Sequence, residues 1–215
     1  DAPVCVGYQH NDAFPGSHPL FAGPLGYNGS KAGMELISEA DVVLCLGTRL
    51  NPFSTLPGYG MDYWPRDAKI IQVDINPSRI GLTKMVTVGI VADAAKAANG
   101  ILAQLSDTAG DAGRAERKSK IAQTKSAWKQ QLSSMDHEED DPGTTWNERA
   151  REARPDWMSP RQAWRAIQSA LPRNAIISSD IGNNCAIGNA YPDFDAGRKS
   201  VSYTHLRAHE TKANL

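Results

Sequence analysis

The chain has 215 residues, with 23 Lys and Arg against 24 Asp and Glu, and it begins with Asp1 rather than Met. This length accommodates one domain or parts of two, and a net charge of -1 gives no basic face for nucleic acid. No run of about 18 apolar residues predicts a membrane span, and we find no signal peptide. We therefore expect neither nucleic-acid nor membrane partners, and we interpret the chain as a fragment.

Strands and helices alternate along the first hundred residues. Apolar runs predict four strands, at residues 2–8, 41–47, 69–74 and 86–91. The second of these runs, DVVLCLG, is almost continuously apolar, which is typical of a parallel strand buried on both faces. Residues 9–30 and 48–67 are rich in Gly and Pro and are predicted to be loops.

Short polar residues mark the helices between these strands. Ser30 predicts the N-cap of a helix that runs to about Ala40, and Asp93 caps a helix through Leu105 that is built on Ala97 and Ile101. Asn76–Ile80 is predicted to form one helical turn, with Pro77 at its first position. The alternation favours an α/β fold with a parallel sheet. Because the sheet begins partway, we expect a strand and a helix upstream.

The character of the chain changes after residue 106. Residues 114–132 are good helix formers in which Ile121, Trp128 and Leu132 form one apolar stripe. The acidic run DHEEDD at 136–141 could be a cation site, but it lacks the spacing of a calcium loop and we interpret it as a solvated connector.

A second α/β unit is predicted after this connector. Ser159 caps a helix that starts at Pro160, ends before Pro172, and has Ala163, Trp164, Ile167 and Leu171 on one face. Residues 175–179, AIISS, then predict a buried strand. This strand leads into DIGNN at 180–184, and in open α/β sheets ligands bind beyond the carboxyl ends of strands.

Three cysteines lie far apart in the sequence, at Cys5, Cys45 and Cys185. Their odd number and the absence of a Cys-x-x-Cys pair favour buried thiols in a reducing cytosol. We therefore expect a cytoplasmic protein.

The last fifteen residues, 201–215, have a different origin in our interpretation. His205 and His209 are four residues apart, a spacing that could bind zinc on a helix. However, VSYTHLRAHET at 201–211 coincides with the in-frame translation of a sequencing-library adapter. We therefore exclude these residues from fold reasoning, and expect neither an ordered tail nor a metal site there.

Four segments resemble the central domain of thiamine-diphosphate enzymes, of which acetolactate synthase is the best known: AFPGSHPL (13–20), GPLGYNG (23–29), ADVVLCLGTRLNP (40–52) and AKIIQVDINPSRIG (68–81). GYQHNDAFPGSHPL, SMDHEEDDPGT and ISSDIGNNCAIGNAYP are most similar to the sulfoacetaldehyde acetyltransferase family. The resemblance covers residues 1–199, including the connector.

The resemblance implies four parts. Residues 1–106 would be an incomplete, Rossmann-like central domain with a parallel sheet, and 107–156 a charged helical linker. Residues 157–200 would begin a C-terminal domain that binds thiamine diphosphate, and 201–215 would be the adapter-derived tail.

The implied chemistry belongs to taurine and sulfonate metabolism. Members of the family convert sulfoacetaldehyde and phosphate into acetyl phosphate and sulfite through an acetyl-cofactor intermediate, with thiamine diphosphate and Mg²⁺, and their sites form between subunits of a homodimer or homotetramer. Their catalytic glutamate lies in an N-terminal domain, and a GDG…N motif in the C-terminal domain binds the metal. We expect both to lie outside this chain, so we assign it no catalytic residue or metal ligand and expect it to be inactive.

The resemblance assigns cofactor contact to Ile181, Gly182, Asn183 and Asn184, which would meet the diphosphate. Glycine allows close backbone approach, and amides donate to phosphate oxygens. Alternatively, Asn183 and Asn184 only cap the following helix. Asp180 is expected to be a turn residue and not catalytic.

The central domain of acetolactate synthase relatives holds FAD at motifs like G-x-H-G and R-F-D-D. Here these positions are Gly26-Tyr27-Asn28-Gly29 and Arg49-Leu50-Asn51-Pro52, so we do not expect FAD. Arg49 could meet an anion, although an ion pair or contact with loop carbonyls is the alternative. His10 and His18 lie in a loop that could face neighbouring domains, or they could be purely structural.

Two other functions remain open. One is a carboligase such as an acetolactate synthase or a glyoxylate carboligase, and the segments GYQHNDAFPG and DIGNNCAIGN disfavour it. The other is a non-catalytic nucleotide-binding module, which the start of a second α/β unit disfavours. The sheet alone does not decide, because this architecture hosts many activities.

Overall fold

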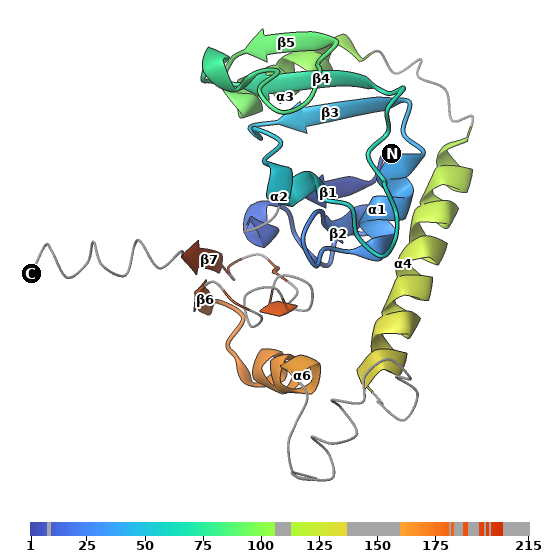
Figure 1. Ribbon diagram of the computed structural model, residues 1–215, viewed down its shortest axis with the longest axis vertical. Coiled ribbons are helices and arrows are strands. Elements are labelled where there is room, and N and C mark those ends of the chain that lie inside the picture. The colour runs from blue at the N-terminus through green and yellow to red at the C-terminus, as the bar shows by residue number, and fades with distance from the viewer. Residues whose placement is uncertain are drawn as a thin grey trace, which may run out of the picture.

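The computed structural model describes residues 1–7, 10–105, 113–136, 160–180, 182, 187–188, 194–195, 197 and 199–203. Its strands form three groups, and every strand pairing is parallel. The strands are β1 (Val4–Val6) and β2 (Phe21–Pro24), then β3 (Val42–Leu46), β4 (Lys69–Asp74) and β5 (Val88–Val91), then β6 (Ile176–Asp180) and β7 (Lys199–Tyr203). From top to bottom, Figure 1 shows the group β3–β5, then β1 and β2, then β6 and β7. The predicted α/β class is confirmed.

Two short helices and two strands, β2 and β7, were missed by the sequence patterns. Strand β2, FAGP, lies in the predicted loop 9–30 because a four-residue segment containing Gly and Pro carries no strand signal. Helix α2 (Pro52–Thr55) and the 3-10 turn η1 (Asn11–Ala13) also lie in predicted loops. The turn predicted at Pro77 is present as η2 (Pro77–Arg79).

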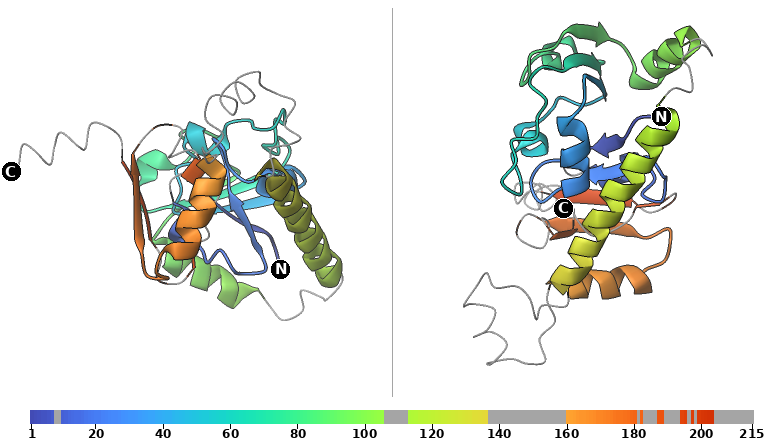
Figure 2. Two further views of the ribbon diagram at one scale, coloured as in Figure 1. Left: turned by 90° about the horizontal axis from the view of Figure 1, so that it is seen from below. Right: turned by 90° about the vertical axis from the view of Figure 1, so that its right-hand side faces the viewer.

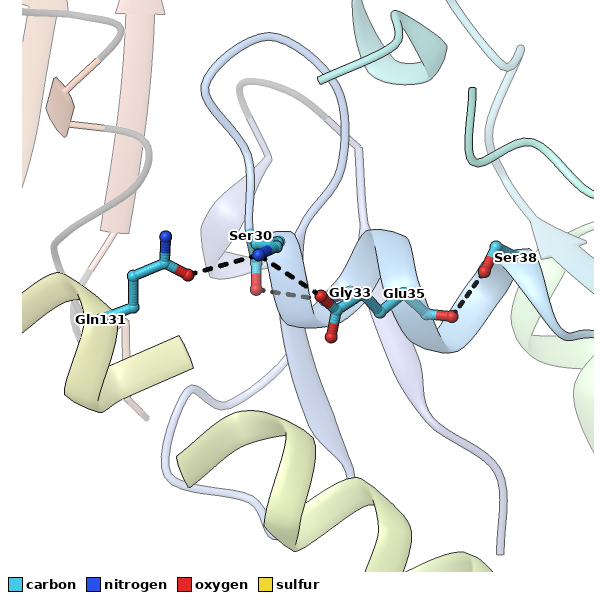
Figure 3. Close-up of polar contacts among 6 residues, drawn as sticks. Ser30, Gly33, Glu35, Ser38 and Gln131 are labelled. Carbon is cyan, nitrogen blue, oxygen red and sulfur yellow. Dashed lines mark hydrogen bonds and ion pairs between the residues drawn. The ribbon is translucent and has the colours of Figure 1, made fainter. Parts of the chain in front are cut away.

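Two of the predicted helix caps, at Ser30 and Asp93, are present, and Ser159 lies outside the described residues. Helix α1 (Lys31–Ser38) begins after Ser30, whose hydroxyl accepts a hydrogen bond from the amide of Gly33 at 3.2 Å (Figure 3). Helix α3 (Ala94–Gln104) begins after Asp93, whose carboxylate accepts from the amide of Lys96 at 2.9 Å. Each cap satisfies a backbone donor that has no partner within the helix.

Helix α1 organises the main core. Its residues Met34 and Ile37 form a buried cluster with Leu25 and Tyr63. Cys5 of β1 and Val43 of β3 both pack against this cluster. One helix therefore covers part of two separate strand groups.

Helix α4 (Arg114–Asp136) runs beside α1 and the β1–β2 pair and continues to the level of α6 (Figures 1 and 2). Ile121, only 2% exposed, packs on Ala22 of β2 and Leu36 of α1. Trp128 meets Tyr59 edge to face, with ring centroids 5.2 Å apart. The burial of Ile121 and Trp128 agrees with the predicted apolar stripe.

Strand β3 is buried on one face only, so the expectation of burial on both faces was wrong. Side chains alternate between the faces of a strand. Cys45 is 4% exposed on the face that α1 covers, whereas Val42, Leu44 and Leu46 on the other face are 41–48% exposed. Along β3, no described helix covers this second face.

Two other buried surfaces were also overestimated. Strand β6 was expected to be buried, yet Ile176 is 70% exposed because, among the described strands, β6 pairs only with β7. Helix α3 turns Ala97, Ile101 and Leu105 toward Ile90 of β5, but the two elements leave an open apolar groove of about 510 Å³ between them. No residue of α3 is buried.

The cysteine prediction holds where the structure describes it. Cys45 is buried and Cys5 partly buried, and neither forms a disulfide. Burial raises the pKa of Cys5 to about 12 and that of Cys45 to about 11. Cys185 lies outside the described residues.

Candidate functional site

The candidate site follows β6 in the second α/β unit. Helix α6 (Pro160–Ala170) begins at the predicted Pro160, and a turn closed by the Ala175 amide and the Pro172 carbonyl leads into β6. Asp180 is the last residue of β6, opposite Tyr203 of β7, and is not a turn residue as expected. The chain therefore leaves the sheet at the carboxyl end of a parallel strand, where ligands bind in open α/β folds.

Gly182 is the predicted site residue that the structure describes. Its φ of +140° lies in a region that residues with a side chain rarely adopt, and no atom of the described residues lies within 4 Å of the position that a Cβ would take. This open space would let a phosphate group approach the backbone. Ile181, Asn183 and Asn184 lie outside the described residues, so their contacts and the capping alternative stay predictions.

The segment after the site packs tightly on α6. A Cβ added to Gly188 would lie 2.7 Å from the ring of Trp164. Trp164, on the predicted apolar face of α6, thus fixes how closely the chain beyond the candidate site can approach the helix.

A loop of the first unit also docks onto this region, as one of the two alternatives for His10 and His18 expected. The amide of Gly16 donates to the carbonyl of Phe194 at 2.9 Å, and that of Ser17 donates to a carboxylate oxygen of Asp195 at 2.8 Å. Lys199 at the start of β7 lies 4.0 Å from the carboxylate of Asp12. The loop that contains His10 and His18 therefore faces the second unit.

His18 has a structural role in this loop. Its ring Nδ1 accepts a hydrogen bond from the amide of Leu20 at 3.1 Å. The carbonyls of His18 and Pro19 accept from the ammonium group of Lys125 on α4, at 3.2 and 3.0 Å. His10 is exposed, and its backbone begins η1.

The crevice at the carboxyl ends of β3 and β4 is filled by internal hydrogen bonds. The side-chain amide of Gln72, 1% exposed, donates to the carbonyls of Thr48 and Arg79 and accepts from the amide of Gly81. A carboxylate oxygen of Asp74 accepts from the amide of Asn76 at 2.8 Å. The exposed Arg49 side chain forms no ion pair within the described part of the chain.

The Gly26–Gly29 turn has a packing explanation. A Cβ on Gly26 would lie 1.9 Å from the carbonyl oxygen of Phe53, and one on Gly29 would lie 2.5 Å from that of Pro24. The hydroxyl of Tyr59 donates to the carbonyl of Gly29 at 2.8 Å. These glycines let the turn lie directly on α2.

No helix in the described residues is long and apolar enough to cross a bilayer, and no three His, Cys, Asp or Glu side chains among them gather as a metal site. The acidic run beyond Asp136, and both His205 and His209, lie outside the described residues.

The predicted tail boundary falls inside β7. The strand continues past Ser200 through Val201, Ser202 and Tyr203, so these three residues have a place in the fold, contrary to expectation. Strand pairing uses backbone groups, which every non-proline residue has, and so tolerates a change of sequence. The origin of residues 201–215 stays a prediction.

The first unit is similar in sequence to a known family. Residues 1–101 match the family described as thiamine pyrophosphate enzyme, central domain. The parallel α/β architecture of these residues agrees with that match, and the resemblance read from the motifs is confirmed.

The chain is also similar to individual proteins over most of its length. The chain is 83% identical over 202 residues to sulfoacetaldehyde acetyltransferase of Roseovarius nubinhibens, and 77% identical over 202 residues to that of Rhodobacter capsulatus. Each comparison covers 94% of this chain and 34% of the relative, so the chain spans about a third of their length. A probable acetolactate synthase large subunit of Methanocaldococcus jannaschii is 36% identical over 103 residues, which is 48% of this chain and 17% of that protein.

Proposed function

We propose that this chain is part of a thiamine-diphosphate-dependent acyltransferase that converts sulfoacetaldehyde and phosphate into acetyl phosphate and sulfite. The observation that carries the proposal is the extent of the similarity. Identity of 77–83% continues over 202 residues, through the connector and the second unit, whereas the acetolactate synthase relative matches only 103 residues. The same contrast disfavours a carboligase or a free-standing nucleotide-binding module.

The reaction balances without an external oxidant. The carbon–sulfur bond of sulfoacetaldehyde breaks and its electron pair leaves with sulfite. The aldehyde carbon gives up its hydrogen as a proton, and the former methylene carbon takes up a proton to become the methyl group. A phosphate oxygen then forms the new bond to the acetyl carbon. Thiamine diphosphate would supply the carbanion chemistry that makes this cleavage possible. This chain would hold the diphosphate through the backbone after β6, at Ile181, Gly182, Asn183 and Asn184. Mg²⁺ would be bound by residues outside the chain, because its sequence contains no G-D-G motif.

The four-part division belongs to the same proposal. Residues 1–106 would form the central domain, 107–156 the linker and 157–200 the start of the cofactor domain. Loop 10–18 would hold the first of these against the third through Gly16, Ser17 and Asp12. The complete protein would be a cytoplasmic homodimer or homotetramer.

The test is a sulfite-release assay on the complete protein with sulfoacetaldehyde, phosphate, thiamine diphosphate and Mg²⁺. We expect sulfite and acetyl phosphate in equal amounts, and no sulfite when phosphate is omitted. Formation of acetolactate from pyruvate, with no sulfite from sulfoacetaldehyde, would support the carboligase instead. The 215-residue chain alone, assayed in parallel, should give no turnover and weak or no cofactor binding.

A further inference from the structure

Two glycines lie at and just beyond the candidate site, and they are needed for different reasons. Gly182 has a φ of +140° and open space around it, so its backbone conformation requires glycine. Gly188 is buried, and its backbone is helical, a conformation that residues with side chains adopt readily. A Cβ at Gly188 would nevertheless lie 2.7, 3.1 and 3.3 Å from the ring carbons Cζ2, Cε2 and Cη2 of Trp164. Position 188 therefore requires glycine because of the space available.

The Trp164 ring is a poor partner for relieving such an overlap. Carbon atoms in ordinary contact are about 3.5–4.0 Å apart, so a methyl group at position 188 needs roughly 1 Å more space. An indole ring moves as one rigid body, and Trp164 is half-buried on α6. By contrast, a Cβ on Gly58 would lie 2.9 Å from the terminal methyl carbon of Met34, a flexible side chain that can yield. At Gly188 we expect the backbone to move instead.

The backbone around Gly188 is held on both sides. Before it, β6 is paired with β7 along its whole length. After it, Phe194 and Asp195 accept hydrogen bonds from loop 10–18, and Phe194 is only 3% exposed. A displacement at Gly188 therefore falls on the chain between these two anchors, and residues 181–184 belong to that stretch.

We propose that Gly188 is a positioning residue for the cofactor. Its missing side chain lets the chain lie directly against Trp164, and this contact sets where the backbone of residues 181–184 meets the diphosphate. Gly188 acts through the chain that precedes it and does not itself contact the cofactor. The inference rests on the proposed function, because it requires that residues 181–184 bind thiamine diphosphate.

The first test is the affinity of the complete protein for thiamine diphosphate, measured by calorimetric titration at constant Mg²⁺. Hydrogen-bond donors lie about 2.7–3.2 Å from their acceptors, so a shift of roughly 1 Å breaks such a bond. Losing one hydrogen bond to a charged group weakens binding by about tenfold or more. We therefore expect Gly188→Ala to raise the Kd for thiamine diphosphate at least tenfold. An unchanged Kd would overturn the inference.

A second substitution tests whether the Trp164 ring is the cause. Trp164→Leu keeps an apolar side chain on α6 but lacks the three ring carbons that a Cβ at position 188 would meet. In the Trp164→Leu background, Gly188→Ala should change the Kd by less than about threefold, because the overlap is gone. This double-mutant cycle isolates the contact between the two residues. A tenfold loss that persists in that background would contradict the proposed role of the contact.

Gly89→Ala is the control for general packing damage. A Cβ on Gly89 would lie 2.6 Å from Cγ2 of Ile80, an overlap as severe as the one at Gly188. Gly89 lies on β5, at the opposite end of the molecule from α6 (Figure 1 and the right-hand view of Figure 2). Gly89→Ala should lower the unfolding temperature and leave the Kd for thiamine diphosphate within about twofold. A rise in Kd equal to that of Gly188→Ala would mean that lost stability alone weakens binding, and the inference would fall.

A measurement on the unsubstituted sequence decides the question even if Gly188→Ala does not fold. The complete protein is labelled with 5-fluorotryptophan, and the Trp164 fluorine resonance is assigned by its absence in Trp164→Leu. Thiamine diphosphate with Mg²⁺ should shift the Trp164 resonance and leave that of Trp128, which packs on Tyr59, unchanged. Binding without a shift at Trp164 would overturn this inference alone, whereas absence of binding would overturn the proposed function as well.

Discussion

Close backbone contacts at single glycines hold the loops around α1. Gly26 and Gly60 both have positive φ angles, +87° and +73°, but their surroundings differ. A side chain on Gly26 would collide with the backbone of Phe53, whereas nothing lies within 4 Å of a side chain on Gly60. The two positions separate backbone strain from steric overlap.

We expect Gly60→Ala to destabilise the protein by about 1 kcal/mol, the cost of a left-handed conformation for a residue with a side chain. Gly26→Ala should cost at least ~3 kcal/mol, because the turn must also move away from α2. Thermal unfolding of the complete protein measures both. Equal losses for the two variants would contradict the importance of the contact with Phe53.

Two buried thiols predict a pH dependence of stability. The pKa values of Cys5 and Cys45 are raised to about 12 and about 11 by burial, while an unfolded cysteine ionises near pH ~8.5. Since the unfolded chain loses these protons first, the stability from the neutral thiols is complete below pH ~8.5 and is lost as the pH rises through the folded pKa values.

Unfolding midpoints measured between pH 7.5 and 10 should therefore fall, and fall less steeply in Cys45→Ala than in the unchanged protein. The same decline in both proteins would show that the Cys45 thiol does not titrate as described.

Helix α4 is attached to the core through a small apolar contact and several polar contacts at the surface. Most of its surface is exposed, and Ile121 makes its deepest apolar contact, against Ala22 and Leu36. The ion pair between Lys120 and Glu39 joins the same two helices at the exposed surface. Apolar burial and surface charge can therefore be compared at neighbouring positions.

We expect Ile121→Ala to lower the free energy of unfolding by about 2–4 kcal/mol, as for other large core residues. Lys120→Ala should cost less than ~1 kcal/mol because both partners are solvated. Denaturant unfolding followed by Trp128 fluorescence reports on the docking of this helix. A larger loss for Lys120→Ala would mean that charge rather than burial attaches α4.

Helix caps and apolar stripes could be predicted because their causes are local. The roles of Ser30, Asp93 and Ile121 were each assigned from residues that lie within a few positions of them in the sequence. Strand β2 and helix α2 could not be predicted, since long-range contacts hold these Gly- and Pro-containing segments. The burial of Leu44 was overestimated because the sequence of a strand does not say what covers it. Of the candidate site, Gly182 could be placed from its position after a strand. That loop 10–18 faces another unit was one of two alternatives, but the individual contacts that dock it had no sequence signal.

At the scale of the whole molecule, loop 10–18 joins the unit that contains β1–β5 to the unit that contains β6 and β7. The hydrogen bond from Ser17 to Asp195 joins residues 178 positions apart. Phe194, whose carbonyl accepts from Gly16, is itself only 3% exposed. The two units are thus joined by buried as well as polar contacts.

This separation has a consequence during synthesis. At translation rates of about 5–20 residues per second, the partner of Ser17 is made roughly 9–36 s after Ser17 itself. Over that interval the unit that contains β1–β5 can fold, but loop 10–18 has nothing to dock against. A nascent chain should therefore be cleaved by protease in this loop until residue 195 leaves the ribosome, and resist cleavage there afterwards.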